Sequence, residues 1–322
     1  MNDYQQADFW PLGSTLYGIG FHWTTWTLPE HGAPLPFPEA VERFDVEAFV
    51  EQAVECGAGH VLLTATHELH WLPGPNPEVD RILPGRTCKR DLIMEIADGL
   101  AKVGIKFMLY YNHGTAHGGT ANPQDPEWQA AVGSRDKDRT RYHENYCRIV
   151  SWMGEHYGPK IIAYWFDSAS ELTRYPDTPW AKFTAAAKVG HPGRLVSYNS
   201  GIMNFEKVTP FQDYWAGEIV GLPLWLSVGA KAPNGLSWYG LCTWNCYDRY
   251  CNQGEWGIHE KSRTHSWVAP DPDVVAACAN RFHFGGWGGA VTFNLLCYQD
   301  GRAIKTDLET MKAVRERIRK KA

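Results

Sequence analysis

Short apolar runs of the strand type alternate with amphipathic helical patterns along this chain, and that alternation restricts its fold more than any other feature. The runs are rich in β-branched and aromatic residues and occupy Leu16–Phe21, His60–Thr64, Phe107–Tyr111, Ile161–Trp165, Arg194–Tyr198, Leu236–Cys242 and Ala290–Leu295. Strands that are apolar on both faces are typical of a parallel sheet covered by helices. The alternation therefore predicts an α/β fold built from βα units.

The helical segments carry their own start and stop signals. Asp45–Cys56 has apolar residues three and four positions apart, with Asp45 as a candidate N-cap and Gly57 as the stop. Lys89–Val103 repeats this pattern and ends at Gly104, directly before the next strand candidate. Two further segments follow the same pattern, Tyr142–Tyr157 and Asp271–Phe284.

The number of units decides between two parallel-sheet architectures. About seven or eight βα units in 322 residues fit a (β/α)8-type, TIM-like barrel better than the alternative, an open doubly wound sheet. The chain has no Gly-x-Gly-x-x-Gly after its first strand and no Gly-x-x-x-x-Gly-Lys motif, which disfavours a nucleotide-binding open sheet. A glycine-rich stretch follows a helix instead, as a turn into the last strand: Gly285, Gly286, Gly288 and Gly289. Barrels of this length form one domain, so we expect a single barrel domain over residues 1–322.

Charge and hydropathy narrow the range of partners. The net charge is −5, and the basic stretch Arg315–Lys321 has the pattern of a helix end, so nucleic acid is not an expected partner. The start of the chain, Met1–Trp10, lacks the features of a signal peptide, and no segment approaches 18 consecutive apolar residues. We therefore expect a cytoplasmic protein without membrane association.

Cysteine spacing gives no sign of a metal centre. Eight cysteines lie mostly within apolar runs, as expected of reduced, buried thiols in a protein that is not exported. Cys242, Cys246 and Cys251 cluster, but their spacing matches no zinc motif. We expect no metal and no cofactor. Fifteen Trp and fifteen Tyr suit the binding of sugar faces as well as core packing.

In a barrel enzyme the working groups follow the carboxyl ends of the strands. The first strand candidate is followed by His22-Trp23, and the second by a run that contains His67, Glu68 and His70. The third runs into Tyr110-Tyr111-Asn112-His113, and the fourth into Trp165-Phe166-Asp167. Histidines 22, 67 and 113 occupy equivalent positions, and this convergence indicates a polar pocket.

Asp167 is the sharpest candidate for chemistry. It follows the apolar run Ile161–Phe166, where a carboxylate needs partners to remain charged. The alternative is a helix N-cap, a role that Ser168 or Ser170 could also fill. A retaining glycosidase needs a second carboxyl group about 5 to 5.5 Å away, and Glu218 and Glu255 are the candidates. Glu218 follows an aromatic-rich segment that could raise its pKa by desolvation, although a solvated loop glutamate is the alternative.

At these residues the chain resembles the α-L-fucosidases of glycoside hydrolase family 29. The most specific match is Tyr157-Gly158-Pro159 followed by Trp165-Phe166-Asp167, which is similar to the segment that carries the nucleophile of that family. Asp213-Tyr214 with Glu218 resembles a later element whose Glu is the acid/base in some members. The resemblance continues through segments that lead into or form the barrel: His22-Trp23, Asp45–Ala58, Val61–His67, Lys89–Leu92, Leu109–Tyr111, Thr243-Trp244 and Gly288–Asn294 with Asp300–Arg302.

The resemblance implies a retaining exo-glycosidase that forms a covalent glycosyl-enzyme intermediate on an α-L-fucoside or a closely related glycoside. Asp167 would be the nucleophile and Glu218 the acid/base. The residues expected to contact the oligosaccharide or glycoside substrate are His22, Trp23, His67, Glu68, His70, Tyr111, Trp165 and Trp244. The C-terminal β-sandwich common in the family is not expected, and the chain could form a homo-oligomer.

Departures from the family pattern affect residues that would contact the sugar. They leave two other functions possible. His67-Glu68 replaces a pair of histidines, Leu69-His70 replaces Asp-Gly, and the Arg that follows the fifth strand's Asn is not evident near Asn199. A carbohydrate-binding barrel without catalysis would fit these changes. A metal-dependent barrel hydrolase would instead use His67, His70, His113 and His117, with Glu68 or Asp167 as a bridge.

Overall fold

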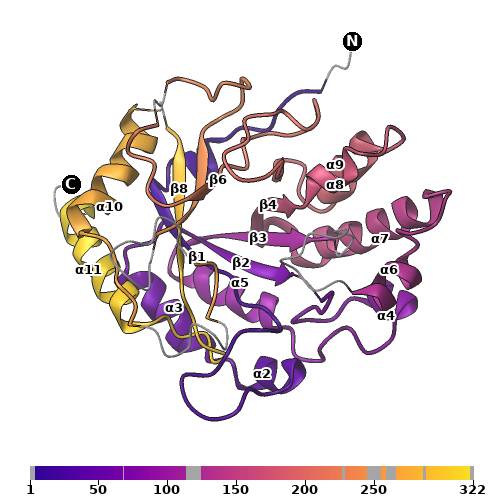
Figure 1. Cartoon of the computed structure of the whole chain (residues 1–322), viewed down its shortest axis with the longest axis horizontal. Helices are drawn as coiled ribbons and strands as arrows, with labels where there is room; N and C mark the ends of the chain where they lie inside the picture. The colour runs from indigo at the N-terminus through magenta and orange to yellow at the C-terminus, as the bar shows by residue number, and fades with distance from the viewer. Residues whose placement is uncertain are drawn as a thin grey trace.

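Eight parallel strands form one curled sheet in a computed structural model that describes residues 4–67, 69–113, 125–226, 229–244, 255–258, 266–285 and 288–319. The strands lie in the order β5-β4-β3-β2-β1-β8-β7-β6 (Figure 1). Their bounds are β1 Tyr17–Phe21, β2 His60–Thr66, β3 Lys106–Asn112, β4 Ile161–Asp167, β5 Leu195–Tyr198, β6 Glu218–Val220, β7 Tyr239–Thr243 and β8 Ala290–Leu295. The predicted (β/α)8, TIM-like architecture is confirmed. The sequence did not predict β6, since three residues carry too little periodicity.

Helices surround the sheet. In Figure 1, α4, α6 and α7 lie on one side of the strands, and α10 and α11 lie on the other. Helices follow the predicted segments closely at α3, α5, α7 and α10, and the bounds are α1 Trp10–Gly13, α2 Phe37–Arg43, α3 Val46–Glu55, α4 Pro77–Ile82, α5 Leu92–Lys102, α6 Pro126–Val132, α7 Thr140–Tyr157, α8 Ala169–Leu172, α9 Trp180–Ala187, α10 Pro272–Asn280 and α11 Lys305–Arg319. The start signal of α3 works as predicted, because the Asp45 carboxylate accepts a hydrogen bond from the Ala48 N–H at 3.0 Å.

Successive residues of each strand face two different apolar layers. The inner layer fills the barrel and includes Leu62, Met108, Tyr110, Ala163, Trp165, Leu195, Tyr214, Tyr239 and Leu241. The outer layer packs the sheet against the helices and includes Val61, Phe107, Tyr111, Tyr164 and Phe293 together with Phe49, Ile96 and Val150. A side chain at the rim can therefore reach the barrel opening only when its residue faces inward.

Asp213 lies in the chain between the two edge strands, β5 and β6, and binds β5 through its backbone and its side chain. Its backbone N–H donates to the Val196 carbonyl at 2.8 Å, and its carboxylate accepts from the Val196 N–H at 2.9 Å. Tyr214 then forms a parallel bridge with Ser237, ahead of β7. Lys188 Nζ lies 2.9 Å from the same carboxylate. The buried side chain of Asp213 thus supplies hydrogen bonds that a full strand partner would otherwise make.

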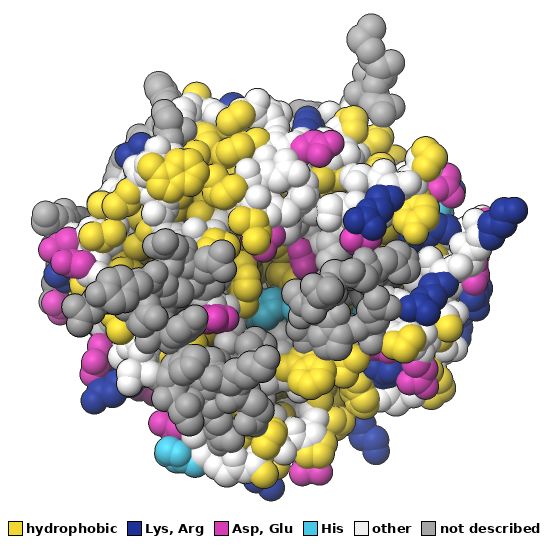
Figure 2. All heavy atoms as spheres, viewed as in Figure 1, with side chains coloured by type: hydrophobic (Ala, Val, Ile, Leu, Met, Phe, Trp, Pro, Cys, Tyr) yellow, Lys and Arg dark blue, Asp and Glu magenta, His cyan; other side chains and the backbone are white. Residues whose placement is uncertain are grey.

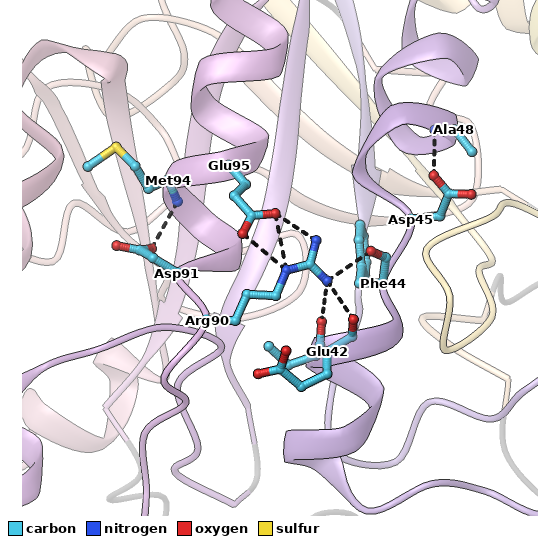
Figure 3. Close-up of polar contacts among 9 residues, drawn as sticks. Glu42, Phe44, Asp45, Ala48, Arg90, Asp91, Met94 and Glu95 are labelled. Carbon is cyan, nitrogen blue, oxygen red and sulfur yellow. Dashed lines mark hydrogen bonds and ion pairs between the residues drawn. The ribbon is translucent and has the colours of Figure 1, made fainter.

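Arg90 fastens α2 to the beginning of α5 (Figure 3). Its guanidinium donates to the carbonyls of Val41, Glu42 and Phe44 at the end of α2, and it pairs with Glu95 at 2.6 Å. Carbonyls at a helix C-terminus lack partners within the helix and form the negative end of its dipole, so a cation stabilises them. Arg90 therefore has a structural part in the segment that resembles the fucosidases.

The cysteines that the structure describes carry free thiols: Cys56, Cys88, Cys147, Cys242, Cys278 and Cys297. Cys246, Cys251 and Gly286 lie outside the described residues. Among the helices in the described ranges, none combines the length and the apolar character needed to span a bilayer.

Candidate active site

Seven polar side chains converge where the parallel strands end. Four of them belong to the three strands β3, β4 and β6, and the other three directly follow β1, β2 and β5. The seven residues are His22, His67, Tyr110, Asn112, Asp167, Asn199 and Glu218. Figure 2 shows a hollow near the centre of one face of the molecule, with histidine and acidic side chains in it. The carboxyl ends of strands are where barrels place their active sites.

Asp167, the last residue of β4, is held by donors on both of its oxygens. Oδ2 accepts from the Tyr110 hydroxyl at 2.5 Å, from Asn112 Nδ2 at 3.1 Å and from the Ser168 hydroxyl at 3.3 Å. Oδ1 accepts from Asn199 Nδ2 at 2.9 Å. These bonds stabilise the ionised carboxylate in a site that is partly removed from water. The helix-cap interpretation does not apply, since Ser168 is the residue that precedes α8.

Glu218 begins β6 and faces the same asparagine. Its Oε2 accepts a hydrogen bond from Asn199 Nδ2 at 2.7 Å. Asn199 therefore contacts both carboxyl groups through one nitrogen. Because Asp167 Oδ1 lies 2.9 Å from that nitrogen, the two carboxylate oxygens can be no more than about 5.6 Å apart.

Burial and a neighbouring charge give Glu218 a higher pKa than an ordinary glutamate has. Desolvation and the neighbouring charge of Asp167 raise the pKa of Glu218 to about 7, while the hydrogen bond from Asn199 acts in the opposite direction. Burial, followed by the charge of Asp167, also raises the pKa of Tyr110 far above its usual value, so its hydroxyl keeps its proton and donates it in a hydrogen bond. The site thus holds one carboxyl group that can act as an acid near neutral pH.

His22 and His67 form an aromatic wall beside Tyr110. The two imidazole rings are 4.3 Å apart, and the Tyr110 ring lies 5.2 Å from His22 and 5.9 Å from His67. Regular alternation from the inward residue His60 would turn His67 outward. A register shift between Thr64 and Thr66 adds one residue to β2, which brings His67 to the inner face.

Four residues predicted to contact the sugar lie instead in the outer layer. Trp23, Tyr111 and Trp244 belong to the core between sheet and helices. His70 is buried, stacks on Trp128 at 3.7 Å and pairs with the Tyr111 hydroxyl at 2.8 Å. Strand alternation explains the placement of Trp23, Tyr111 and Trp244, which directly follow an inward residue. His70 lies beyond the end of β2, where its contacts with Trp128 and Tyr111 hold it in the outer layer.

Trp165 faces inward but is covered. Its ring stacks on Tyr110 with 4.9 Å between centroids, its indole N–H donates to the Ala216 carbonyl, and only 1% of the residue is exposed. It supports Tyr110 rather than lining the opening.

The remaining residues that the sequence suggested are not among the seven converging side chains. Glu68 and His117 lie outside the described residues. The backbone carbonyl of Glu255 accepts from Asn294, and His113 contacts the Ser168 carbonyl at 3.1 Å. Within the part of the chain that the structure describes, no group of three or more His, Cys, Asp or Glu side chains is arranged to hold a metal ion.

The residues that sequence reasoning missed are Tyr110, Asn112, Asn199 and Trp256, whose ring lies 5.6 Å from His22. Tyr110 lies within a predicted strand, and Asn112 and Asn199 directly follow predicted strands, so their positions were visible in the sequence. Nothing in a single sequence told which strand-end residues face inward.

The sequence matches the family model described as Alpha-L-fucosidase over residues 17–216, which is more than half of the chain. No curated protein matches it in sequence.

Solved structures share the fold at low sequence identity. The α-L-fucosidase AlfC from Lactobacillus casei in complex with its α-L-fucose product is 15% identical, with a TM-score of 0.62 over 97% of this chain and 98% of that chain. The α-L-fucosidase isoenzyme 1 from Paenibacillus thiaminolyticus is 18% identical, with a TM-score of 0.65 over 94% of this chain and 73% of that chain. An endo-fucoidan hydrolase from glycoside hydrolase family 107 is 15% identical, with a TM-score of 0.64 over 95% of this chain and 52% of that chain. Since the family model spans the strands from β1 to β5 and the segment before β6, this chain is a glycoside hydrolase that belongs to the α-L-fucosidase family.

Proposed function

We propose that this protein hydrolyses α-L-fucosides, or glycosides of a closely related sugar, from the end of a chain and with net retention of configuration. Asp167 is the nucleophile and Glu218 the acid/base. The proposal extends family membership to a substrate class, a stereochemical course and two residue roles.

The observation that carries the proposal is the bridge from Asn199 Nδ2 to both carboxyl groups. It limits the nearest oxygens of Asp167 and Glu218 to about 5.6 Å. Retaining glycosidases hold their two carboxyl groups about 5 to 5.5 Å apart, whereas inverting enzymes need about 6.5 to 9.5 Å to fit a water molecule. The short separation supports retention.

A double displacement needs one ionised carboxylate and one carboxyl group that can donate a proton, and we assign these parts to Asp167 and Glu218. In the first step an oxygen of Asp167 bonds to the anomeric carbon while the glycosidic bond breaks and the Glu218 proton moves to the leaving oxygen. In the second step the Glu218 carboxylate takes a proton from water, and the water oxygen bonds to the anomeric carbon and releases Asp167. The raised pKa of Glu218 supports its part as the proton donor near neutral pH.

The sugar would be oriented by side chains at the opening of the barrel. His22, His67 and Trp256 lie close together on the inner side, and their rings can both donate hydrogen bonds and pack against a sugar face. Glu68, next to His67 in sequence, replaces a histidine of the family pattern. It would form a hydrogen bond with a different hydroxyl of the sugar than a histidine would. A site built for one hydroxyl arrangement can reject another by roughly 10⁴-fold.

Similar proteins support an α-L-fucoside as the first substrate to test. Solved structures with this fold contain α-L-fucose as a product and Fuca(1,6)GlcNAc as a ligand. The deciding experiment measures turnover of 4-nitrophenyl α-L-fucoside beside the β-L-fucoside, α-L-galactoside, α-L-rhamnoside and β-D-galactoside.

Three proteins are compared: the natural chain, Asp167→Asn and, as a matched control, Asp98→Asn at an exposed position of α5. We expect cleavage of the α-L-fucoside, a loss of roughly 10⁴-fold or more in Asp167→Asn, and no change in the control. Cleavage of another glycoside would move the specificity but keep Asp167. Turnover that survives in Asp167→Asn, or ligand binding with no turnover at all, would refute the proposal.

A further inference from the structure

The amide of Asn199 is locked in one orientation. Its Oδ1 accepts the backbone N–H of Gly201 at 3.0 Å, and its own backbone N–H donates to the Phe166 carbonyl at 2.8 Å. Gly201 has φ +112°, a backbone conformation that L side chains rarely adopt, so the turn that presents this N–H favours glycine. Because Oδ1 is already used by a donor, the NH2 group of Asn199 must be the part that faces the two carboxyl groups.

An NH2 group can only donate, so each oxygen that it touches must accept a hydrogen bond. Asn199 Nδ2 has two hydrogens, and Asp167 Oδ1 and Glu218 Oε2 lie 2.9 and 2.7 Å away. Both oxygens therefore act as acceptors, and the carbonyl oxygen of a protonated carboxyl group is a better acceptor than its hydroxyl oxygen. The contact therefore favours a proton on Glu218 Oε1, the oxygen that does not contact Asn199.

We propose that Asn199 is a positioning residue that prevents Asp167 and Glu218 from sharing a proton, so that Asp167 stays an ionised nucleophile while Glu218 holds its proton on Oε1. This inference rests on the proposed function, because it deepens the roles given there to the two carboxyl groups.

The need for such a residue follows from the short distance between two acids. Two carboxyl groups in a buried site can share a proton directly when their oxygens are about 3 Å apart, as in the aspartic-protease dyad, and at about 5 Å they can pass one through a water molecule that donates to one and accepts from the other. A proton shared with Asp167 would neutralise the nucleophile. A donor inserted between the two oxygens removes that arrangement, since each oxygen then receives a hydrogen bond from the amide instead.

The amide also suits the task better than a charged side chain would. A lysine or arginine at this position would favour the ionised form of both carboxyl groups and would remove the acid. A third carboxyl group would add negative charge. The neutral amide lowers the pKa of Glu218 only partly against burial and the charge of Asp167, so that the pKa stays at about 7. Asn199 itself is only 3% exposed, so water does not compete for its hydrogens.

Asn112 offers a matched control, because it is also a rim asparagine but its Nδ2 contacts Asp167 and Ser168 and has no hydrogen bond to Glu218 among the described contacts. The experiment compares the natural protein, Asn199→Ser and Asn112→Ser. The Glu218 titration is followed by ¹³C NMR of carboxyl-labelled glutamate, with Glu218→Gln identifying the signal. The pH dependence of kcat/KM for 4-nitrophenyl α-L-fucoside is measured on the same samples.

We expect Asn199→Ser to move the Glu218 titration upward by about one pH unit, because the bond that favours its ionised form is lost. The basic limb of the kcat/KM profile should move with it, and kcat/KM should fall by roughly 10²-fold. Asn112→Ser should lower kcat/KM while leaving the Glu218 titration in place. A Glu218 titration that is unmoved in Asn199→Ser, or moved equally in both variants, would overturn the inference.

A second variant covers the case in which Asn199→Ser does not fold. Asn199→Ala removes the donor without adding a charge, so the Glu218 titration should again move upward; no movement counts against the inference. The NMR arm needs no turnover. If the natural protein fails to cleave any glycoside, the proposed function fails by itself, while the titration still decides the placement of the proton.

Discussion

Tyr110 and Tyr111 are neighbours in β3 but face opposite sides of the sheet. The Tyr110 hydroxyl donates to Asp167 Oδ2 at 2.5 Å inside the barrel, and the Tyr111 hydroxyl pairs with His70 Nε2 at 2.8 Å in the outer layer. A tyrosine thus belongs to the candidate site at position 110, and a tyrosine packs against the helices at position 111. The pair separates catalytic effects from structural ones.

Tyr110→Phe should damage catalysis without unfolding the protein. The ring can keep its stack on Trp165, while the hydrogen bond to a charged oxygen, worth about 1.5 to 3 kcal/mol, is lost. We expect kcat/KM on the preferred glycoside to fall by roughly 10- to 150-fold, as measured by initial rates, with little change in Tm.

Tyr111→Phe is the control. It leaves His70 Nε2 without its partner in a buried place, which should cost about 1 to 2 kcal/mol of unfolding free energy, while kcat/KM stays within about twofold. Equal losses of activity in both variants would contradict the assignment of the two faces.

The rate should decline above neutral pH. Glu218 must be protonated to donate to the leaving oxygen, and its pKa is raised to about 7 by burial and by Asp167. We therefore expect kcat/KM to fall about tenfold per pH unit above this value. Glu218→Gln should abolish that limb in the residual activity towards substrates with good leaving groups. A profile that stays flat up to pH 9 would exclude Glu218 as the acid.

Glu218 should also make stability depend on pH. Its folded-state pKa of about 7 exceeds the ordinary value of 4.5, so the folded chain holds this proton more tightly than the unfolded chain does. The stabilisation is complete below about pH 4.5 and is lost as the pH rises through 7. When the pH rises from 5 to 8.5, the unfolding free energy of Glu218→Gln should increase by about 3 kcal/mol relative to that of the natural protein. Urea unfolding at both pH values measures this, with the exposed Glu206→Gln as control.

One oxygen of Asp167 should be the attacking atom. Oδ2 accepts from Tyr110, Asn112 and Ser168, whereas among the described donors only Asn199 contacts Oδ1. The more strongly held oxygen is suited to remain the carbonyl oxygen of the glycosyl ester. A crystal structure of the enzyme trapped with a 2-deoxy-2-fluoro glycosyl fluoride should show the anomeric carbon bonded to Oδ1. A bond to Oδ2 would contradict this assignment.

Arg194 should contribute stability but not catalysis. It is fully buried, and its guanidinium donates to five carbonyls, those of Gly154, Gly158, Ile161, Ala187 and Val189. A lysine has three donors at a single point and cannot replace this fork. We expect Arg194→Lys to cost about 3 kcal/mol or more of unfolding free energy, measured by urea titration, with unchanged turnover per folded molecule. The exposed Arg174→Lys is the control and should change neither quantity.

Much of the fold could be predicted from local patterns. Seven of the strands and the helices α3, α5, α7 and α10 lie close to the predicted segments, because hydrophobic periodicity and signals such as Asp45 and Gly57 act over a few residues. The strand β6 could not be predicted, since its three residues are held by the neighbouring β7 rather than by their own pattern.

The sequence by itself determined that Asp167 stands at a strand end and that Glu218 follows an aromatic-rich segment, because an acid after an apolar or aromatic run is visible without knowledge of its partners. Only the tertiary structure decided which neighbours face inward. A strand has a period of two residues, so a shift of one residue exchanges Tyr110 for Tyr111, and the irregularity after Thr64 does the same for His67. The position of Asn199 between two carboxyl groups from different strands depends on how the sheet curls, and that arrangement arises from contacts between residues far apart in the chain.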